Sequence, residues 1–287
     1  MKTILNRLAR LASLAKLASL ARLVRLVRLA SLATLAILAL PAPAQENASL
    51  IGIGPSRLLD TYITPEQFSG LGLTFLNIRE HIPAGKHWGN LIEHELNLSS
   101  AKDRSHSLAM LEGDYSLYWG RYRHWTLLGD SQSPTRLHLQ AGALANANLG
   151  FIYAMLNSNN PAQARISLNI MPAAVATFHF PLFAQHFKLR YELNLPLAGL
   201  MFSPNYGQSY YEIFSRGNYD HNIVPTTFVS APYLRQMLTL EWQTGRKWNI
   251  RIGYLGNYQQ AQVNSLKQHV YTHRLMIGIS KTIRSDW

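Results

Sequence analysis

The sequence contains no cysteine in its 287 residues. The protein therefore has no disulfide, no thiolate metal ligand and no cysteine nucleophile. It also cannot carry the lipid anchor of a lipoprotein, because that anchor requires a cysteine at the cleavage point.

Acidic residues are absent from the first 44 positions, which hold seven of the 27 basic residues of the chain. The uncharged run from Leu29 to Leu40 has the length of a signal-peptide core and is shorter than the ~20 residues of a membrane-spanning helix. Ala42 and Ala44 form the small-x-small pattern that signal peptidase recognises. We therefore expect residues 1–44 to be a cleaved signal peptide and the mature protein, residues 45–287, to begin at Gln45.

Leucine recurs at every third position upstream of Leu38, a spacing that spirals around a helix and forms no stripe. We interpret it as a lengthened n-region or a start codon assigned too early, with a basic amphipathic helix on a membrane surface as the alternative. Removing residues 1–44 lowers the formal net charge from +12 to +5, because all 15 acidic residues remain. No basic cluster with interleaved aromatic residues is left, so we expect no nucleic-acid partner.

An exported chain without a lipid anchor or a long apolar helix is soluble, secreted or a membrane barrel. From about residue 70 the sequence alternates with a period of two, which only a strand sorts onto two faces. In the clearest segment, Phe187, Leu189, Tyr191, Leu193, Leu195 and Leu197 lie on one face, and Lys188, Arg190, Glu192 and Asn194 lie on the other. The fold class is therefore all-β.

A soluble sandwich would also alternate, with its apolar face inward. Three features favour the inverted arrangement, with lipid outside. The polar faces are rich in Gly, Asn, Gln and Ser, the strands approach the ~9–11 residues that cross a bilayer, and aromatic residues lie beside the short connections. We therefore predict a single antiparallel transmembrane β-barrel in an outer membrane.

The short and long connections alternate along the chain. Strands are predicted at 47–58, 71–82, 87–98, 107–128, 135–152, 163–178, 185–201, 232–243, 248–261 and 269–283, with external loops at 60–70, 99–107, 157–163, 203–231 and 262–268. An even number of strands places both mature termini in the periplasm. Ten strands satisfy this parity, although a turn at Gly120 could divide the long strand, so eight to twelve remain possible.

The run Leu58-Leu59-Asp60-Thr61-Tyr62, followed by Pro65, Glu66 and Gly70, resembles a sequence near the start of small uncharacterised outer-membrane barrels of Bacteroidota, a domain of unknown function. The resemblance covers about 15 residues. It implies the fold and the compartment, and it brings no activity or catalytic residue. The chain departs from the usual pattern at its end, where Lys281 and Ser285 interrupt the apolar alternation before Trp287.

The predicted interior carries charges of both signs, so we expect a plug of paired charges, because an unpaired buried charge is costly. A narrow channel for small polar solutes is the alternative. The interior set comprises Glu93, Glu95, Glu112, Asp114, Arg136, His138, Arg165, Lys188, Arg190, Glu192, Arg235, Glu241, Arg251 and Arg274.

No catalytic or metal site is predicted, and no cofactor. Ser116 and His138, with Glu112 or Asp114, would permit a membrane-embedded hydrolase, but no serine lies in a Gly-x-Ser-x-Gly sequence. His94 cannot share a metal with its two neighbouring glutamates, because adjacent strand residues point to opposite faces. His94 and Glu93 are interpreted as ordinary wall residues.

The loop 203–231 is rich in tyrosine, a residue that gives recognition surfaces large contact area at low entropic cost. Tyr206, Tyr210, Tyr211, Phe214 and Tyr219 are the predicted external contacts, although the loop could instead close the barrel mouth. The sequence thus favours a non-enzymatic barrel with a structural or surface-interaction role. Its expected partners are the outer-membrane lipid bilayer, the outer-membrane assembly machinery and an extracellular or membrane protein.

Overall fold

The computed structural model describes residues 46–83, 86–130, 133–155, 161–244 and 248–282. The predicted signal peptide and its cleavage site lie outside these ranges. No helix in the described ranges has the length and apolar character needed to cross a membrane. The described elements are β1 (Glu46–Asp60), β2 (Thr64–His81), β3 (Trp88–Lys102), β4 (Ala109–Leu128), β5 (Arg136–Ala154), β6 (Ala162–Leu182), β7 (Gln185–Asn194), β8 (Ala198–Phe202), α2 (Tyr210–Phe214), β9 (Ile223–Thr227), β10 (Tyr233–Gln243), β11 (Asn249–Val263) and β12 (Leu266–Thr282).

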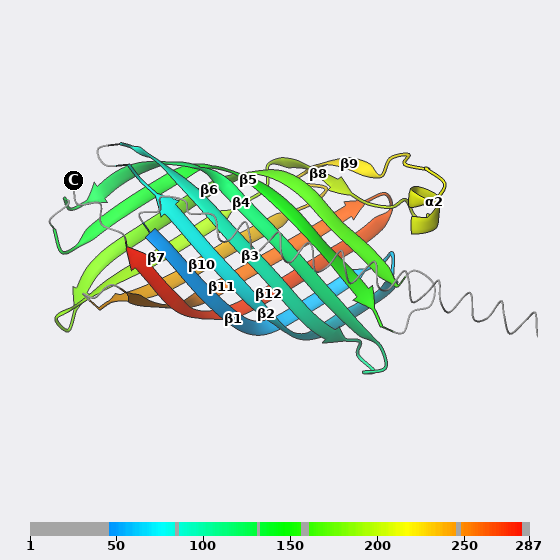
Figure 1. The fold of residues 1–287 in the computed structure, drawn as a ribbon, viewed down its shortest axis with the longest axis horizontal. Helices are drawn as coiled ribbons and strands as arrows, with labels where there is room; N and C mark the ends of the chain where they lie inside the picture. The colour runs from blue at the N-terminus through cyan, green and yellow to red at the C-terminus, as the bar shows by residue number, and fades with distance from the viewer. Residues whose placement is uncertain (1–45, 84–85, 131–132, 156–160, 245–247, 283–287) are drawn as a thin grey trace, which may run out of the picture. The chain divides into compact units, whose positions relative to one another are not determined.

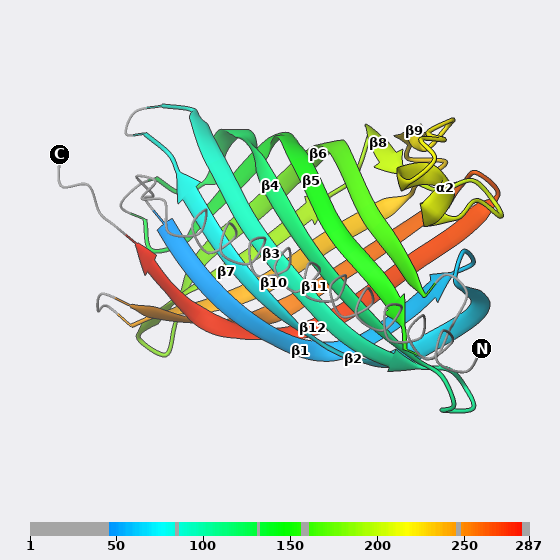
Figure 2. The same ribbon diagram turned by 45° about the vertical axis from the view of Figure 1, so that its right-hand side comes forward.

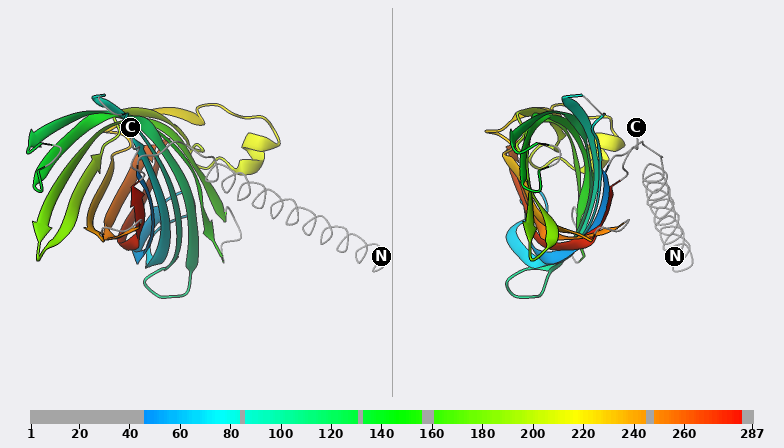
Figure 3. Two further views of the ribbon diagram at one scale, coloured as in Figure 1. Left: turned by 60° about the vertical axis from the view of Figure 1, so that its left-hand side comes forward. Right: turned by 90° about the vertical axis from the view of Figure 1, so that its left-hand side faces the viewer.

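Ten of these strands close into one antiparallel ring (Figures 1 and 3). Strands β1 to β7 pair in chain order, β7 then pairs with β10, β10 with β11, β11 with β12, and β12 with β1. The two remaining strands form a hairpin in which β8 pairs with the first half of β6 and β9 pairs with β8. The predicted all-β barrel of ten strands is confirmed.

The register of the ring fixes the tilt of its strands. Starting at Ile53 on β1, the chain of directly opposed residues can be followed around the ring in either direction until it reaches β6. The path through β2 to β5 ends at Ala164, and the path through β12, β11, β10 and β7 ends at Ala176, so the register is offset by 12 residues around the ring. With a rise of ~3.3 Å and a separation of ~4.8 Å, this stagger tilts ten strands by about 40°. The tilt lies within the range of membrane barrels.

The apolar faces of the strands point outward. Residues opposed across neighbouring strands share a face, and Leu275, Ile53, Leu73 and Leu98 form one such row. All four are more than half exposed, whereas the alternate positions are mostly buried. The inverted arrangement expected from the sequence is the one observed.

Two predicted loops differ from the structure, whereas the long predicted strand 107–128 is observed undivided. Strand β4 runs without interruption through Gly120, so the long predicted strand contains no hidden turn. The predicted loop 60–70 is mostly strand, because β1 and β2 extend to a turn at 61–63. The predicted loop 262–268 is likewise a tight turn in which Asn264 and Ser265 both have positive φ, the geometry of a two-residue hairpin.

The predicted strand 185–201 is divided into β7 and β8. The division falls at Pro196, which has no N–H to donate to a neighbouring strand. The flanking residues keep the chain beside β6, because Leu195 N donates to Pro172 O and Leu197 N donates to Ile170 O. Pro172 also lacks an N–H, so the two prolines meet where the ladder changes partner from β7 to β8.

The first and last described residues of the chain, Glu46 and Thr282, lie at the end of the barrel that carries the short turns. Glu46 is opposite Glu80 at the end of β2 and opposite Thr282 at the end of β12. The longer segment that contains α2 and the β8–β9 hairpin lies at the other end (Figure 2). We call these the short-turn end and the long-segment end.

Candidate functional site

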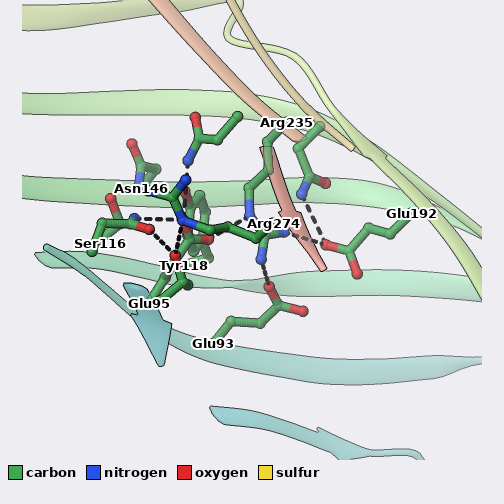
Figure 4. A network of polar contacts seen from close by, with 12 residues as sticks. Glu93, Glu95, Ser116, Tyr118, Asn146, Glu192, Arg235 and Arg274 are labelled. Carbon is green, nitrogen blue, oxygen red and sulfur yellow. Dashed lines mark hydrogen bonds and ion pairs between the residues drawn. The ribbon is translucent and has the colours of Figure 1, made fainter. Parts of the chain in front are cut away.

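A charged cluster occupies the centre of the barrel (Figure 4). Arg235 on β10 contacts three carboxylates, with distances of 2.6 Å from Nη2 to Glu93 Oε2, 2.8 Å from Nε to Glu95 Oε2 and 3.0 Å from Nη1 to Glu192 Oε1. Its guanidinium also lies 4.5 Å from the ring centre of Tyr118, a cation–π distance. All five side chains are fully buried. Because their strands lie on different sides of the ring, the contacts tie β3, β4, β7 and β10 together across the interior.

A second cluster lies toward the short-turn end. Lys188 Nζ is 2.8 Å from Glu46 Oε2 and 3.1 Å from Glu241 Oε1. Arg251 contacts the same two carboxylates, with a distance of 2.5 Å to Glu241 Oε2. Arg190 Nη1 lies 2.5 Å from Glu192, which also contacts Arg235 in the central cluster. Two cations and two carboxylates therefore balance each other's charge, as buried ions require, and Glu46 is the partly exposed member.

Arg274 on β12 is held by uncharged oxygen atoms. It donates to the carbonyl groups of Gly54 and Pro55 at 2.9 and 2.8 Å and to the hydroxyl groups of Ser56, Thr74 and Ser99 at 2.8–3.2 Å. A Cβ at Gly72 would lie 2.4 Å from its Nη2. The glycine is therefore needed to make room for the guanidinium.

A third ionic group lies toward the long-segment end. Arg165 is 3.2 Å from Glu112 and 3.9 Å from Asp114. Ser116 donates to Asp114 at 3.2 Å and accepts from Asn148 at 2.9 Å. No histidine contacts Ser116 in the described part of the chain, and its hydrogen-bond partners are Asp114 and Asn148.

The remaining predicted interior residues, Arg136 and His138, lie half-buried near the start of β5 at the short-turn end. His138 contacts Thr126 at 3.2 Å and packs edge-on against His179. The structure therefore separates His138 from Ser116. His94, on the outer face of β3, contacts the Tyr115 hydroxyl at 2.8 Å, and no group of three potential metal ligands occurs among the described residues.

Apolar side chains fill the interior between and beyond the charged clusters. One apolar group includes Leu50, Leu76, Leu144, Met237 and Met276, which come from five different strands. A second group closes the long-segment end and comprises Leu58, Tyr62, Ile63, Phe68, Ala101, Met110, Ile152, Ala154, Leu266 and Val270. We call this second group the mouth cluster.

One small polar cavity lies beneath the long segment. It has a volume of about 50 Å³ and is lined by residues that include Asn146, Arg165, Thr226, Tyr233 and Gln259. A volume of this size holds a few water molecules.

The segment 203–231 packs over the mouth cluster. Tyr62 Oη donates to Gln208 O at 3.0 Å, and Tyr210 Oη accepts from Ala164 N at 2.7 Å while donating to Gln163 at 2.9 Å. Burial raises the pKa of Tyr210, so its hydroxyl stays protonated for these bonds. The segment is thereby fastened to β1 and β6.

Helix α2 in this segment begins with a capping box, in which Ser209 and Glu212 bond reciprocally to each other's backbone N–H. This arrangement satisfies two N–H groups at the helix start. Asn222 then ties the two arms of the segment together, donating to Gln208 Oε1 at 2.7 Å and to Ser203 O at 3.2 Å.

The predicted external tyrosines divide into two kinds. Tyr206, Tyr211, Phe214 and Tyr219 are all more than 60% exposed, whereas Tyr210 is partly buried and fastens the segment to the barrel. Sequence composition alone could not separate them. Spacing on α2 separates Tyr210 from Tyr211 but not from Phe214, which stacks on Tyr210 and is still exposed.

Sequence reasoning missed Glu46 and the hydroxyls around Arg274. Glu46 lies one residue before the predicted first strand, although continuing the period of two back from Ala48 would have placed it inside. Ser56, Thr74 and Ser99 carry no charge and therefore gave no signal of their own.

The model of one protein family, described as "Protein of unknown function (DUF3316)", matches residues 36–285. No curated protein matches the chain in sequence. The Bacteroidota origin suggested by the short resemblance near Leu58 is not part of this match.

Several solved structures are similar to this chain. The transport unit of the autotransporter AIDA-I from Escherichia coli is 8% identical, with a TM-score of 0.44, and the match covers 86% of this chain and 94% of that one. Neisserial surface protein A is 10% identical, with a TM-score of 0.31 and coverage of 84% and 98%. An outer-membrane channel from Pseudomonas putida F1 is 8% identical, with a TM-score of 0.32 and coverage of 85% and 97%.

Proposed function

The chain belongs to the DUF3316 family, and from its geometry we propose that it is a non-enzymatic outer-membrane β-barrel with a plugged interior and a structural or surface-interaction role. The observation that carries this proposal is the filled interior. Arg235, Arg251 and Arg274 are fully buried; Arg235 is bonded across the ring to β3, and the other two are bonded to neighbouring strands. Apolar side chains occupy the levels between them and the long-segment end.

The outer face supports membrane insertion. Its exposed apolar residues include Ile51, Leu149, Leu168, Ile252 and Ile277, from five different strands. A soluble barrel would cover or replace such a belt, because large exposed apolar patches drive association. In the closed ring the ten strands pair on both sides over most of their length, which leaves little unpaired backbone for lipid.

Tryptophans and basic residues at the short-turn end support an interfacial position for that end. Arg121 lies over Trp88 at 5.7 Å, Arg123 over Trp125 at 5.5 Å and Lys281 over Trp248 at 5.9 Å. Amphipathic aromatic rings favour the headgroup level of a bilayer. We call these three cations the short-turn rim cations.

Outer-membrane barrels turn their short connections toward the periplasm. In that orientation both mature termini are periplasmic and the segment 203–231 faces outward, with Tyr206, Tyr211, Phe214 and Tyr219 as the contacts for an extracellular or membrane-protein partner. The outer-membrane assembly machinery is the expected partner during insertion. The charges inside the barrel then serve to fix its shape, since they face no substrate.

Conductance of the refolded barrel in a planar bilayer tests the plug. We expect no discrete openings, whereas a porin refolded in the same way provides the positive control. Reproducible unit openings from the wild-type chain would contradict the plugged interior and favour the narrow channel. Phospholipid hydrolysis above that of Ser116→Ala would contradict the non-enzymatic role.

A further inference from the structure

A concave basic surface lies on the outer wall at the long-segment end. It encloses about 750 Å³ and is lined by Arg57, Glu66, Gln67, Ser69, Lys102, Asp103, Arg104, Ser105 and His106. We call it the basic groove. It is separate from the filled interior and from the aromatic segment.

The register of β1, β2 and β3 aims the groove outward. Arg57 is directly opposite Ser69, and Ser69 is directly opposite Lys102, so the three side chains share one face of the sheet. Their neighbours Leu58, Phe68 and Ala101 are buried in the mouth cluster. The two cations therefore point away from the interior and toward the surroundings of the barrel.

The cations of the groove are available for a ligand. Arg57, Lys102 and Arg104 are exposed, and none of them forms an ion pair within the residues that the structure describes. Of the two carboxylates, Asp103 is engaged by its own loop, where it accepts from the Ser105 hydroxyl and from Leu108 N. These bonds hold its pKa at about 2. Glu66 is the one exposed carboxylate lining the groove.

The groove ends where the apolar belt begins. Toward the short-turn end, the next row on the same outer face consists of Pro55, Leu71 and Ser100. The row after that consists of Ile53, Leu73 and Leu98. Ile53, Leu73 and Leu98 are each more than half exposed. Arg57 and Ile53 are four residues apart, about 13 Å along the strand. A ligand with an anionic head and apolar chains would fit both surfaces at once.

We propose that the basic groove binds the phosphorylated headgroup of a glycolipid in the outer leaflet, with the acyl chains of that lipid lying on Ile53, Leu73 and Leu98. Arginine forms bidentate bonds to phosphate and lysine adds a point charge, while Ser69 offers a hydroxyl donor. Basic pockets beside an apolar membrane face are suited to such headgroups. The proposal rests on the proposed function, because only that orientation puts the groove in the outer leaflet.

The short-turn rim cations provide a matched control. They are equal in number to the groove cations and also lie on the outside of the barrel, but each is stacked over a tryptophan at the opposite rim. Charge alone would make both sets equivalent for an anionic lipid. A site built by position and shape would distinguish them.

The test measures binding of purified diphosphoryl lipid A to the refolded mature barrel in detergent micelles by native mass spectrometry. Three proteins are compared: the wild type, the groove variant Arg57→Gln/Lys102→Gln/Arg104→Gln, and the rim variant Arg121→Gln/Arg123→Gln/Lys281→Gln. We expect the groove variant to bind roughly tenfold more weakly or worse and the rim variant to bind as the wild type does. Dephosphorylated lipid A should bind the wild type as weakly as diphosphoryl lipid A binds the groove variant.

Equal weakening in both variants, or unchanged binding of dephosphorylated lipid A, would overturn the proposal. Displacement of lipid A by an excess of inorganic phosphate would instead assign the groove to a soluble anion and overturn the lipid source. Heat-modifiable migration of the same samples separates failure of the groove assignment from failure of the proposed function. If the barrel is intact and closed but lipid binding fails, only the groove assignment is lost, whereas a wild-type barrel that conducts contradicts the proposed function without touching the groove.

Discussion

The buried carboxylate of Glu192 forms ion pairs with two arginines, Arg190 and Arg235. Replacing it by glutamine keeps the shape but leaves the two cations with less negative charge around them. We expect Glu192→Gln to lower the free energy of unfolding by about 3 kcal/mol, measured by denaturant titration of the bilayer-refolded protein. The exposed Glu66→Gln should change it by less than about 0.5 kcal/mol. Equal effects would mean that the interior charges are solvated.

The next residue tests the opposite face. Leu193 lies on the outer wall between Ala174 and Gln236, so Leu193→Arg places a cation against lipid. The expected cost is about 2 to 4 kcal/mol in the same titration. If the chain instead stays soluble without detergent, with Leu193→Arg ruinous and Glu192→Gln silent, the protein is a soluble sandwich.

Asp60 gives the barrel a dependence on pH. It lies beyond Arg57, above the apolar belt, and accepts from Tyr62 N at 3.0 Å and Gln268 Nε2 at 2.9 Å. Burial raises the pKa of its carboxyl to about 6, from about 3.9 in an unfolded chain. The folded state therefore favours the neutral form. This stabilisation is complete below about pH 4 and is lost as the pH rises through 6.

Between pH 4 and pH 7.5 the wild type should thus lose up to about 3 kcal/mol of unfolding free energy that Asp60→Asn does not lose. Denaturant titrations of both proteins across this range measure the difference. Parallel pH profiles would show that the Asp60 carboxyl has its ordinary pKa in the folded barrel.

At the scale of elements, the long segment predicts a pattern of proteolysis. Arg216 is exposed just after α2, while Lys86 is exposed in a short turn at the opposite end. Trypsin added to intact cells should cut after Arg216, because exposed loops are the preferred sites. It should reach Lys86 only after permeabilisation, and Arg216→Gln should remove the first cut. The reverse order of cutting would invert the topology.

The alternation of apolar and polar residues predicted the positions of most strands. It did not predict that 60–70 is mostly strand, or that the strand 185–201 is divided. Asp60–Gly70 looked like a loop because it contains Pro65 and ends at Gly70, but pairing to β1 keeps most of it extended. The split at Pro196 depends on Pro172 across the sheet, and no single segment of sequence carries that pairing. Local pattern identifies a strand, whereas its ends depend on the neighbouring strand.

For the whole molecule, parity and alternation predicted ten strands and an inward charged face. They did not predict how much of the interior is apolar. Leu76, Leu144 and Leu255 point inward and pack with side chains from other strands, because the ring is narrow enough for opposite walls to touch. Alternation separates two faces of one strand but contains no information about contact across the barrel.

Closure of the ring predicts heat-modifiable migration in gels. All ten strands are paired on both sides through most of their length, so detergent finds no edge from which to unzip the barrel without heating. We expect unboiled samples in sodium dodecyl sulfate to migrate differently from boiled ones. Identical migration would indicate an open sheet, and deletion of β12 should abolish the difference by exposing β1 and β11.

The seam between β1 and β12 sets the order in which this chain can fold. The other pairings in the ring join consecutive strands, or join β7 to β10 across the segment 195–232, but this one joins Glu46 to Thr282. Bringing those ends together costs about 5 kcal/mol of chain entropy. The niche that holds Arg274 is built from β1, β2 and β3, so its guanidinium can leave water only when the seam closes. Until β12 is synthesised and paired, the chain therefore has unpaired strand edges at β1 and β11, and Arg274 lacks its partners. This is the interval in which the chain needs a chaperone.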